Sequence, residues 1–276
     1  METVVGGVPV HFVEHGSGTP VLALHGAGVD HRELAGGLEP MFGSLPGFRR
    51  LYPDLPGMGR TPAHGSLNSN DDVLDLLLRF IDSTIGDELF LLIGQSFGGY
   101  LASAVAHLRP RAAGLALICP VGADAGSVPR HEVLVSSVHH AGLDAASEAS
   151  FRSYFVVQTD ETLNRFRQFV APGAALVDEP GLARIFSRWE LRDRPESVER
   201  YPHPVLVLVG RQDATAGYAD GWALAQDFPR GTFAVLDRAG HALLHEQPAL
   251  VQAFLTEWIG RVREDQALAQ AGSRLP

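Results

Sequence analysis

The sequence predicts an α/β fold: a doubly wound, mostly parallel central sheet with an inserted helical cap. Short apolar runs alternate with segments of helical periodicity along most of the chain, as in repeated strand-helix units. Residues 122–200 interrupt this alternation, because they show helix-like spacing without a strand pattern. The 276 residues, 45% of them apolar, suffice for one large core with an insertion. We therefore expect a core of residues 1–121 and 201–264, a cap of residues 122–200, and a polar tail of residues 265–276.

The predicted elements follow one another in a regular order. Residues 3–14 alternate apolar and polar positions around Gly6 and Gly7, which predicts an antiparallel hairpin. The apolar runs beyond it are typical of strands buried on both faces, and they cover residues 20–25, 49–52, 88–93, 112–119, 204–209 and 232–236. Helical periodicity covers residues 71–85, 98–108, 217–228 and 247–262.

Composition excludes several classes of function. The net charge of −10 would repel nucleic acid and anionic membranes, so we expect a small-molecule substrate and no nucleic-acid or membrane partner. All 22 basic residues are arginine, which excludes a Schiff-base lysine and a P-loop lysine. The single cysteine, Cys119, cannot form an intrachain disulfide, and we expect a buried thiol without a function. No signal-like or membrane-spanning run is visible, so we expect a cytoplasmic protein; a homodimer remains open.

The most informative motif is Gly94-Gln95-Ser96-Phe97-Gly98, which directly follows an apolar run. A serine hydroxyl is a weak nucleophile, so a site that uses one presents the oxygen on a sharp turn beside a base. Glycines at both ends of the motif permit such a turn and close packing of strand against helix. An isolated copy of the motif is as often a simple turn, but the strand before it and the helix after it favour Ser96 as a nucleophile.

A nucleophile of this kind needs a histidine base and a carboxylate, all at the carboxyl edge of the sheet. His241 follows the last predicted strand, so we predict it as the base. Asp213 follows the preceding strand and gives the chain order Ser, Asp, His. Asp124 and Asp237 also lie near predicted strand ends and remain alternatives for the acid. Asp213 is preferred.

Backbone amides suit the negative charge that develops on a substrate oxygen, because they need no reorganisation. The amides of Ala27 and Phe97 follow two neighbouring strands and are the predicted oxyanion hole. We expect His25 to make structural hydrogen bonds beneath this loop. His245 stands four residues after His241, but no glutamate lies between them and no third ligand is evident, so we expect no metal site.

Four motifs together give the chain a resemblance to a known family. They are His25-Gly26-Ala27-Gly28, the segment 54–61, the segment 94–99, and Gly240-His241 followed by Glu246 and Pro248. In this order they resemble the α/β-hydrolase fold family, specifically its cap-bearing, cofactor-free members. The resemblance covers nearly the whole chain. It implies Ser96 as nucleophile, Asp213 as acid, His241 as base, the Ala27 and Phe97 amides as oxyanion hole, a structural turn over residues 54–59, and no cofactor.

Departures from the family pattern narrow the reaction. Dehalogenases and epoxide hydrolases of the family carry aspartate where this chain has Ser96. Ala27 is smaller than the residue usual in cofactor-free haloperoxidases, and Val29-Asp30 stands where carbon–carbon bond hydrolases tend to have a proline. Cleavage of an ester, lactone or thioester through an acyl-enzyme is therefore favoured. A carbon–carbon hydrolase, a proton-transfer lyase and a non-catalytic small-molecule binder remain alternatives.

The predicted cap is expected to select a small, apolar acyl substrate. Its aromatic side chains could form an apolar ceiling, and they are Phe151, Tyr154, Phe155, Phe166, Phe169, Phe186 and Trp189. Aromatic residues at helical spacing more often pack a small domain onto its neighbour, so we expect only two or three to face the site. Phe151, Phe155 and Trp189 are the predicted substrate-binding residues. The sequence does not identify the acyl or the leaving group.

Overall fold

The structure, a computed structural model, describes residues 1–122, 128–192 and 201–272. The strands are β1 (Glu2–Val5), β2 (Val8–Gly16), β3 (Thr19–Leu24), β4 (Phe48–Pro53), β5 (Phe90–Gln95), β6 (Ala112–Ile118), β7 (Val135–Ser136), β8 (Val157–Gln158), β9 (Val205–Gly210) and β10 (Gly231–Leu236). The helices are α1 (His31–Phe42), α2 (Asn70–Thr84), α3 (Phe97–Leu108), α4 (Ala145–Tyr154), α5 (Asp160–Arg165), the π-helix η1 (Phe166–Val170), α6 (Ala171–Ala174), α7 (Glu179–Phe186), α8 (Ala219–Gln226), α9 (Leu243–Glu246) and α10 (Pro248–Gly272).

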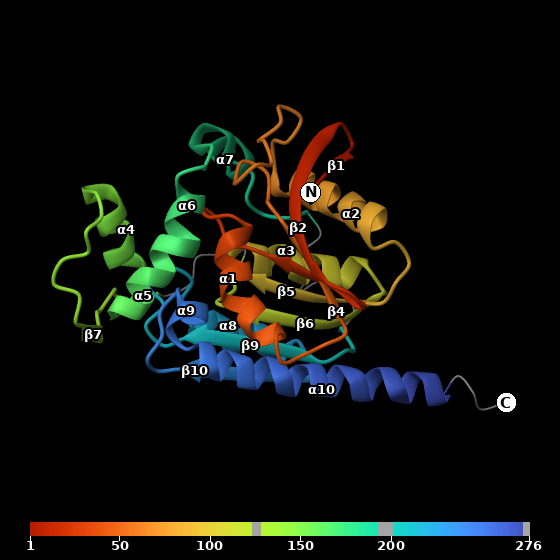
Figure 1. Cartoon of the computed structure of the whole chain (residues 1–276). Coiled ribbons are helices and arrows are strands. Elements are labelled where there is room, and N and C mark those ends of the chain that lie inside the picture. Colours follow the sequence, from red (N-terminus) through yellow and green to blue (C-terminus); the bar gives the residue numbers. More distant parts are fainter. Residues whose placement is uncertain (123–127, 193–200, 273–276) are drawn as a thin grey trace.

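Eight strands form one twisted sheet between two layers of helices (Figure 1). Their order is β1-β2-β4-β3-β5-β6-β9-β10. The β1–β2 and β2–β4 pairs are antiparallel, and every later pair in this sheet is parallel. The predicted fold class, a mostly parallel doubly wound sheet, is confirmed.

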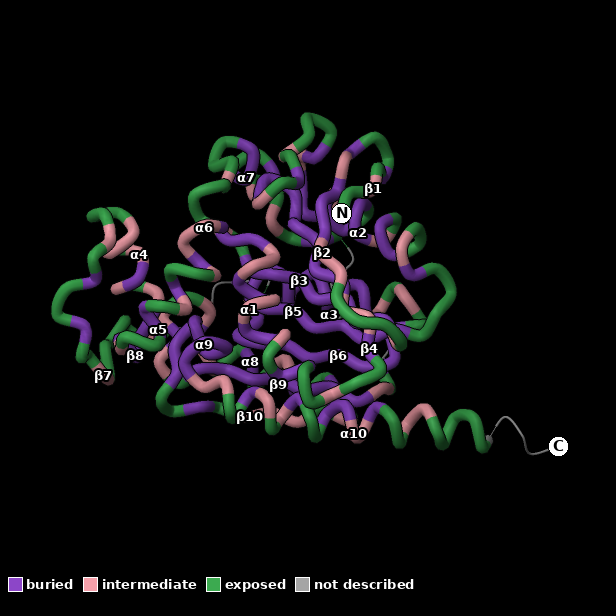
Figure 2. The backbone as a smooth tube through the Cα atoms, in the orientation of Figure 1, coloured by how far each residue is buried: buried purple, intermediate pink, exposed green. Residues whose placement is uncertain are grey.

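Both faces of the sheet are buried, which explains why its strands read as unbroken apolar runs. Neighbouring residues on β3 point to opposite faces. Val21 belongs to a core that includes Leu34 of α1 and Trp258 of α10, while Leu22 belongs to one that includes Phe80 of α2. All five residues are buried, and the central strands β5 and β6 have the colour of buried residues along their length in Figure 2. Helices α1, α9 and α10 thus cover one face, and α2, α3 and α8 cover the other.

The amino-terminal hairpin forms as predicted. Val5 pairs with Val8, so Gly6 and Gly7 alone make the turn between β1 and β2. Their φ angles of 56° and 85° lie in the left-handed region, where glycine has no steric penalty. The glycine pair therefore sets the register of the first two strands.

Helix α1 lies where the sequence predicts no helix. Gly36, Gly37 and Pro40 in its sequence weaken the helical signal. A Cβ added to Gly37 would lie 2.2 Å from Cγ of Leu244 on α9, so this glycine permits the two helices to pack closely. The side chain of Asp30 begins the helix by accepting a hydrogen bond from Arg32 N at 3.0 Å.

Helix α10 continues ten residues beyond its predicted end. The segment predicted as a polar tail is helical as far as Gly272, and α10 extends past the edge of the sheet (Figure 1). Residues 263–272 include three alanines and two glutamines, which sustain a helix without burial. In the described part of the chain, no helix is both long and apolar enough to cross a membrane.

The segment between β6 and β9, here called the inserted segment, contains β7, β8, α4, α5, η1, α6 and α7. It holds mostly helices, together with a two-residue parallel β7–β8 pair that the sequence did not predict. Phe151 and Phe166 belong to a separate small core with Val29. Leu182 of α7 belongs instead to the main core. The α4–α6 part therefore packs around its own apolar centre, and Figure 1 shows it beside the sheet rather than over one face.

Candidate active site

Ser96 lies at the sharp turn between β5 and α3. Its φ and ψ of 52° and −120° form a strained conformation for a residue with a side chain. Backbone contacts hold it there: Ser96 N donates to Ile118 O at 3.0 Å, and Gly99 N donates to Ser96 O at 2.9 Å. A Cβ on Gly98 would lie 2.1 Å from Leu24 O, so only glycine allows α3 to start this close to β3.

Asp213 and His241 meet at the same edge of the sheet. The loop after β9 carries Asp213 and the loop after β10 carries His241, and Oδ2 lies 2.8 Å from His241 Nδ1. The other carboxylate oxygen accepts hydrogen bonds from Thr215 N and Ala216 N at 2.8 and 2.9 Å. Burial opposes ionisation of Asp213, but His241 and these amides outweigh it and lower its pKa. The ionised carboxylate can only accept, so Nδ1 donates and Nε2 is left as an acceptor.

The structure supports neither of the two alternative carboxylates, Asp237 and Asp124, as the partner of His241. Asp237 is exposed and its side chain makes no contact with His241 among the described residues. Asp124 lies outside the described residues. Asp213, the preferred candidate from sequence, is the carboxylate that the structure joins to His241.

Ser96 and His241 line one cavity of about 450 Å³. The lining residues are Gly26, Ala27, Gly28, Val29, Gln95, Ser96, His131, Ser150, Ser153, Tyr154, Val170, Ala174, Ala214, Thr215 and His241. Among the described residues, no hydrogen bond joins the Ser96 hydroxyl to His241. Such contacts often tighten only when substrate binds. The cavity is large enough for a small organic molecule beside both groups.

Two backbone amides near Ser96 are free to donate. Ala27 lines the cavity, and Phe97 begins α3 directly after Ser96. Neither amide donates a hydrogen bond to any other described residue. A Cβ on Gly26 would lie 3.1 Å from Cβ of Ser96, so this glycine brings the β3 loop close to the turn. Donors of this kind suit a negatively charged oxygen.

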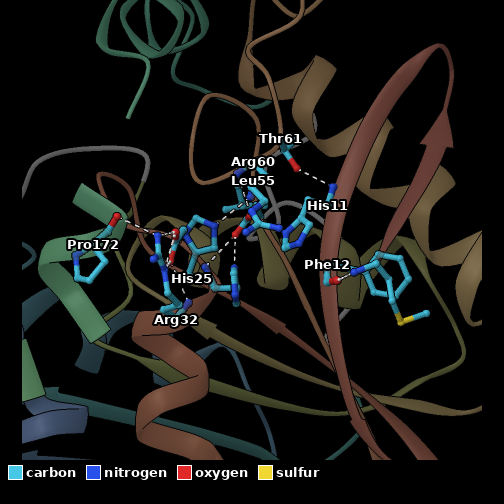
Figure 3. Close-up of polar contacts among 12 residues, drawn as sticks. His11, Phe12, His25, Arg32, Leu55, Arg60, Thr61 and Pro172 are labelled. Carbon is cyan, nitrogen blue, oxygen red and sulfur yellow. Dashed lines mark hydrogen bonds and ion pairs between the residues drawn. The ribbon is translucent and has the colours of Figure 1, made fainter. Parts of the chain in front are cut away.

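Buried histidines fix the β3 loop from below, as expected for His25. Nε2 of His25 accepts from Leu55 N at 2.9 Å (Figure 3). Its Nδ1 therefore carries the proton and donates to Gly26 O at 2.7 Å. Asp54 accepts from Nδ1 of both His11 and His31, at 2.8 and 2.6 Å. These partners hold the pKa of Asp54 far below its usual range against the cost of burial. The predicted structural turn is thus anchored to β2 and α1.

The three aromatic residues predicted to bind substrate lie outside the cavity lining. Phe151 and Phe155 are fully buried in the core of the inserted segment, with ring centroids 5.2 Å apart. Trp189 stacks on Tyr100 at 5.7 Å, in the main core. Residues 150, 153 and 154 of α4 line the cavity, while Phe151 of α4 and Phe155, which directly follows this helix, belong to the apolar core. Of the seven candidate aromatic residues, only Tyr154 lines the cavity among the described residues.

Tyr154 contacts a buried acid, Glu33, that the sequence analysis did not predict as part of the site. Its hydroxyl lies 3.0 Å from Glu33 Oε1 on α1, and its ring meets that of His241 edge-on at 5.9 Å. Glu33 is 1% exposed, and burial raises its pKa to about 7 although Tyr154 opposes the shift. Glu33 Oε2 and both ring nitrogens of the adjacent His245 have no hydrogen-bond partner among the described residues. Nothing in the local sequence pattern of α1 marks Glu33, apart from its acidity at a position facing the core.

Glu246 ties the inserted segment to the loop that carries His241. One carboxylate oxygen accepts from Val156 N and Val157 N at 2.7 and 2.9 Å, and the other accepts from Gly240 N at 2.7 Å. The residue before His241 is therefore held by the same side chain that holds Val156 and the start of β8. Glu246 belongs to one of the four sequence motifs, and this contact gives that motif a physical role.

Replacing Glu246 by alanine should lower the free energy of unfolding by about 3–5 kcal/mol, because three buried amides would lose their acceptor. Urea denaturation measures the loss. The matched control is Gln247→Ala, since the Gln247 side chain donates only to Arg238 O at 2.8 Å near the surface. That variant should lose less than about 1 kcal/mol. Equal losses in the two variants would contradict this role for Glu246.

The described residues contain two groups of three potential metal ligands, and within each group the ligand atoms lie within 4.8 Å of one another. One is His11, His31 and Asp54; the other is Cys119, Asp213 and His241. In both groups the carboxylate already accepts a hydrogen bond from histidine Nδ1. Burial raises the pKa of the Cys119 thiol, which disfavours the thiolate that a metal requires. Hydrogen bonds between histidine and carboxylate therefore explain why these side chains lie close together in both groups.

Comparisons with known proteins show which family and which solved structures the chain resembles. A family model described as the alpha/beta hydrolase family matches residues 21–253. A pimeloyl-[acyl-carrier protein] methyl ester esterase from Legionella pneumophila is 23% identical over 91% of this chain and 99% of its own length. A 2-hydroxymuconate semialdehyde hydrolase from Pseudomonas sp. is 26% identical over 93% of each chain. The solved structure of an alpha/beta superfamily hydrolase from Oenococcus oeni has a TM-score of 0.87 at 27% identity, covering 95% of this chain and 99% of that one.

Proposed function

The chain belongs to the alpha/beta hydrolase family, and from that premise we propose that it is a serine hydrolase that cleaves an ester-type bond of a small acyl substrate through an acyl-enzyme. One observation carries the proposal: Ser96, on its strained turn, and His241, oriented by Asp213, line the same cavity. Nucleophile, base and orienting acid thus occur together with two free amide donors. Carboxylesters, lactones and thioesters are the substrate classes of the proposal.

The proposed reaction has two halves. The Ser96 oxygen attacks the carbonyl carbon while His241 Nε2 takes the hydroxyl proton, and the Ala27 and Phe97 amides donate to the resulting oxyanion. The tetrahedral intermediate collapses as His241 gives its proton to the leaving group, which departs and leaves the acyl group on Ser96. Water then attacks the acyl carbon and gives a proton to His241. The second collapse releases the acid and returns the proton to Ser96.

A carbon–carbon hydrolase is the second candidate, because one relative is named a 2-hydroxymuconate semialdehyde hydrolase. Another relative is named a methyl ester esterase, which favours the first candidate. Sustained turnover of p-nitrophenyl butyrate, accompanied by a burst of one p-nitrophenol per enzyme, would support the acyl-enzyme route. Tight binding of small molecules without any turnover would instead support a non-catalytic binder.

The rate should depend on pH through His241. Burial lowers the pKa of His241, but the charge and hydrogen bond of Asp213 outweigh it, so the pKa lies above its ordinary value. Only the neutral ring accepts the proton of Ser96. We expect kcat/KM to rise with pH through this raised pKa, to level off above it, and to fall as pH drops below it. A flat profile between pH 5.5 and 8.5 would contradict His241 as the base.

The proposal retains three expectations from sequence: a small-molecule substrate, catalysis without a cofactor, and action in the cytoplasm. The net charge of −10 supports the first expectation, and the single cysteine, which cannot form an intrachain disulfide, supports the third.

A further inference from the structure

The cavity beside Ser96 has a polar wall whose basic side chains, among the described residues, are His131 and His241. Its lining includes the hydroxyl groups of Ser150, Ser153, Tyr154 and Thr215. No arginine, aspartate or glutamate belongs to the described lining, and the chain has no lysine. A carboxylate that enters this cavity would therefore lose water and would find no arginine or lysine in the described wall to compensate the loss.

A buried carboxyl group stands directly behind this wall. Glu33 Oε1 accepts the hydrogen bond of the Tyr154 hydroxyl at 3.0 Å, and the side chain of Glu33 is 1% exposed. The proton of Tyr154 is thereby committed to Glu33 whenever Glu33 is ionised, which leaves the phenol oxygen without a donor for a substrate anion. With a pKa of about 7, Glu33 carries a negative charge in much of the population at neutral pH.

The groups that face Glu33 do little to neutralise this charge. On α9, His245 Nε2 lies 3.8 Å away, but burial and the charge of Arg165 on α5 lower its pKa to about 3, so its ring is neutral. Asp30, at the start of α1, disfavours ionisation of Glu33. His241 favours it when its own ring is protonated. When a substrate enters, the ring of His241 that acts as the base is neutral, and the charge of Glu33 then acts on the substrate with little compensation.

This inference rests on the proposed ester hydrolysis. We propose that the cavity takes esters without a carboxylate and rejects esters that bear one, and that Glu33 determines this specificity through its charge behind Tyr154. Two like charges about 10 Å apart at a protein interior's effective dielectric repel each other enough for about tenfold discrimination. Loss of the charge from Glu33 should remove that part of the discrimination.

The test compares two esters of matched size across pH. Mono-p-nitrophenyl glutarate carries a carboxylate, and p-nitrophenyl 5-oxohexanoate carries a neutral acetyl group in its place. The ratio of their kcat/KM values cancels the titration of His241, because both esters use the same base. We expect the ratio of neutral to anionic ester to be about tenfold larger at pH 8.5 than at pH 5.5, because Glu33 becomes protonated below its pKa of about 7. An ester that carries a trimethylammonium group should show the opposite trend.

Two variants assign the effect to Glu33. Glu33→Gln keeps the size and an acceptor for Tyr154 but removes the charge, so its ratio should be smaller and should change less with pH than that of the wild type. Glu39→Gln is the matched control: Glu39 lies on the same helix and also accepts from a buried tyrosine, Tyr52, at 2.6 Å, but it lies outside the cavity lining. It should keep the wild-type trend.

The outcomes separate this inference from the function on which it rests. A wild-type ratio that does not change with pH would overturn the inference without any variant, and so would an unchanged trend in Glu33→Gln. In both cases the esters are still hydrolysed and the proposed function stands. If the wild type cleaves neither ester and a fluorophosphonate does not label Ser96, the proposed function itself fails.

Discussion

Replacing Ser96 by alanine should lower kcat for a p-nitrophenyl ester by about a millionfold, because the variant has no oxygen to form the acyl-enzyme. The residual rate should equal what the cavity and the backbone amides of Ala27 and Phe97 supply alone. The measurement is steady-state release of p-nitrophenol at pH 8, with the folded state of the variant verified by its unfolding transition.

Ser103→Ala is the matched control for that experiment. Ser103 is another buried serine on α3, and its hydroxyl donates to Gly99 O at 3.0 Å without lining the cavity. Its loss should cost about 1 kcal/mol of stability and leave kcat within about twofold of the wild type. If both variants kept wild-type turnover, the hydrolysis would not use Ser96.

Asp213→Asn should lower kcat by about ten-thousandfold, a smaller loss than that from Ser96→Ala. The ionised Asp213 accepts from Nδ1 of His241 at 2.8 Å and so leaves Nε2 free to take a proton. An amide at this position can donate to Nδ1 and thereby favour the wrong tautomer. Because the Asp213 charge raises the pKa of His241, the remaining activity should also fall off at a lower pH than in the wild type. Steady-state rates between pH 5 and 9 test both effects.

Asp237→Asn is the control, since Asp237 was a rival acid and is closer to His241 in sequence. Its side chain is exposed, and we expect kcat and the pH profile to stay as in the wild type. A larger loss of kcat from Asp237→Asn than from Asp213→Asn would show that Asp213 is not the acid that orients His241.

The candidate site could be predicted largely because its residues follow strands. Each of Ser96, Asp213 and His241 comes after an apolar run typical of a parallel strand, and the carboxyl ends of such strands meet at one edge. The sequence could not decide among aspartates near that edge. The 2.8 Å contact between Asp213 and His241 identifies the acid. This contact joins two loops, and local sequence patterns do not predict how these loops are positioned relative to each other.

Other features were missed because they depend on contacts between distant segments. Gly37 reads as a helix breaker, yet it is needed where α1 packs on Leu244. Phe151 and Phe155 have the composition of a pocket ceiling, but the small core of the inserted segment buries them completely. The contact of Glu33 with Tyr154 joins residues that are 121 positions apart, so the local sequence around either residue does not predict it. Hydrophobic periodicity thus identified the sheet, while close packing and buried polar pairs required the three-dimensional arrangement.

The central claim is that Ser96 is an activated nucleophile, and the most direct test is the intact mass of the protein after incubation with a fluorophosphonate. This reagent requires no knowledge of the natural substrate, because it reacts with a serine that has a competent base and oxyanion hole. We predict one adduct per chain on the wild type, mapped by peptide analysis to Ser96, and no adduct on Ser96→Ala. An unmodified wild-type chain, or an adduct that persists in the variant, would contradict the claim.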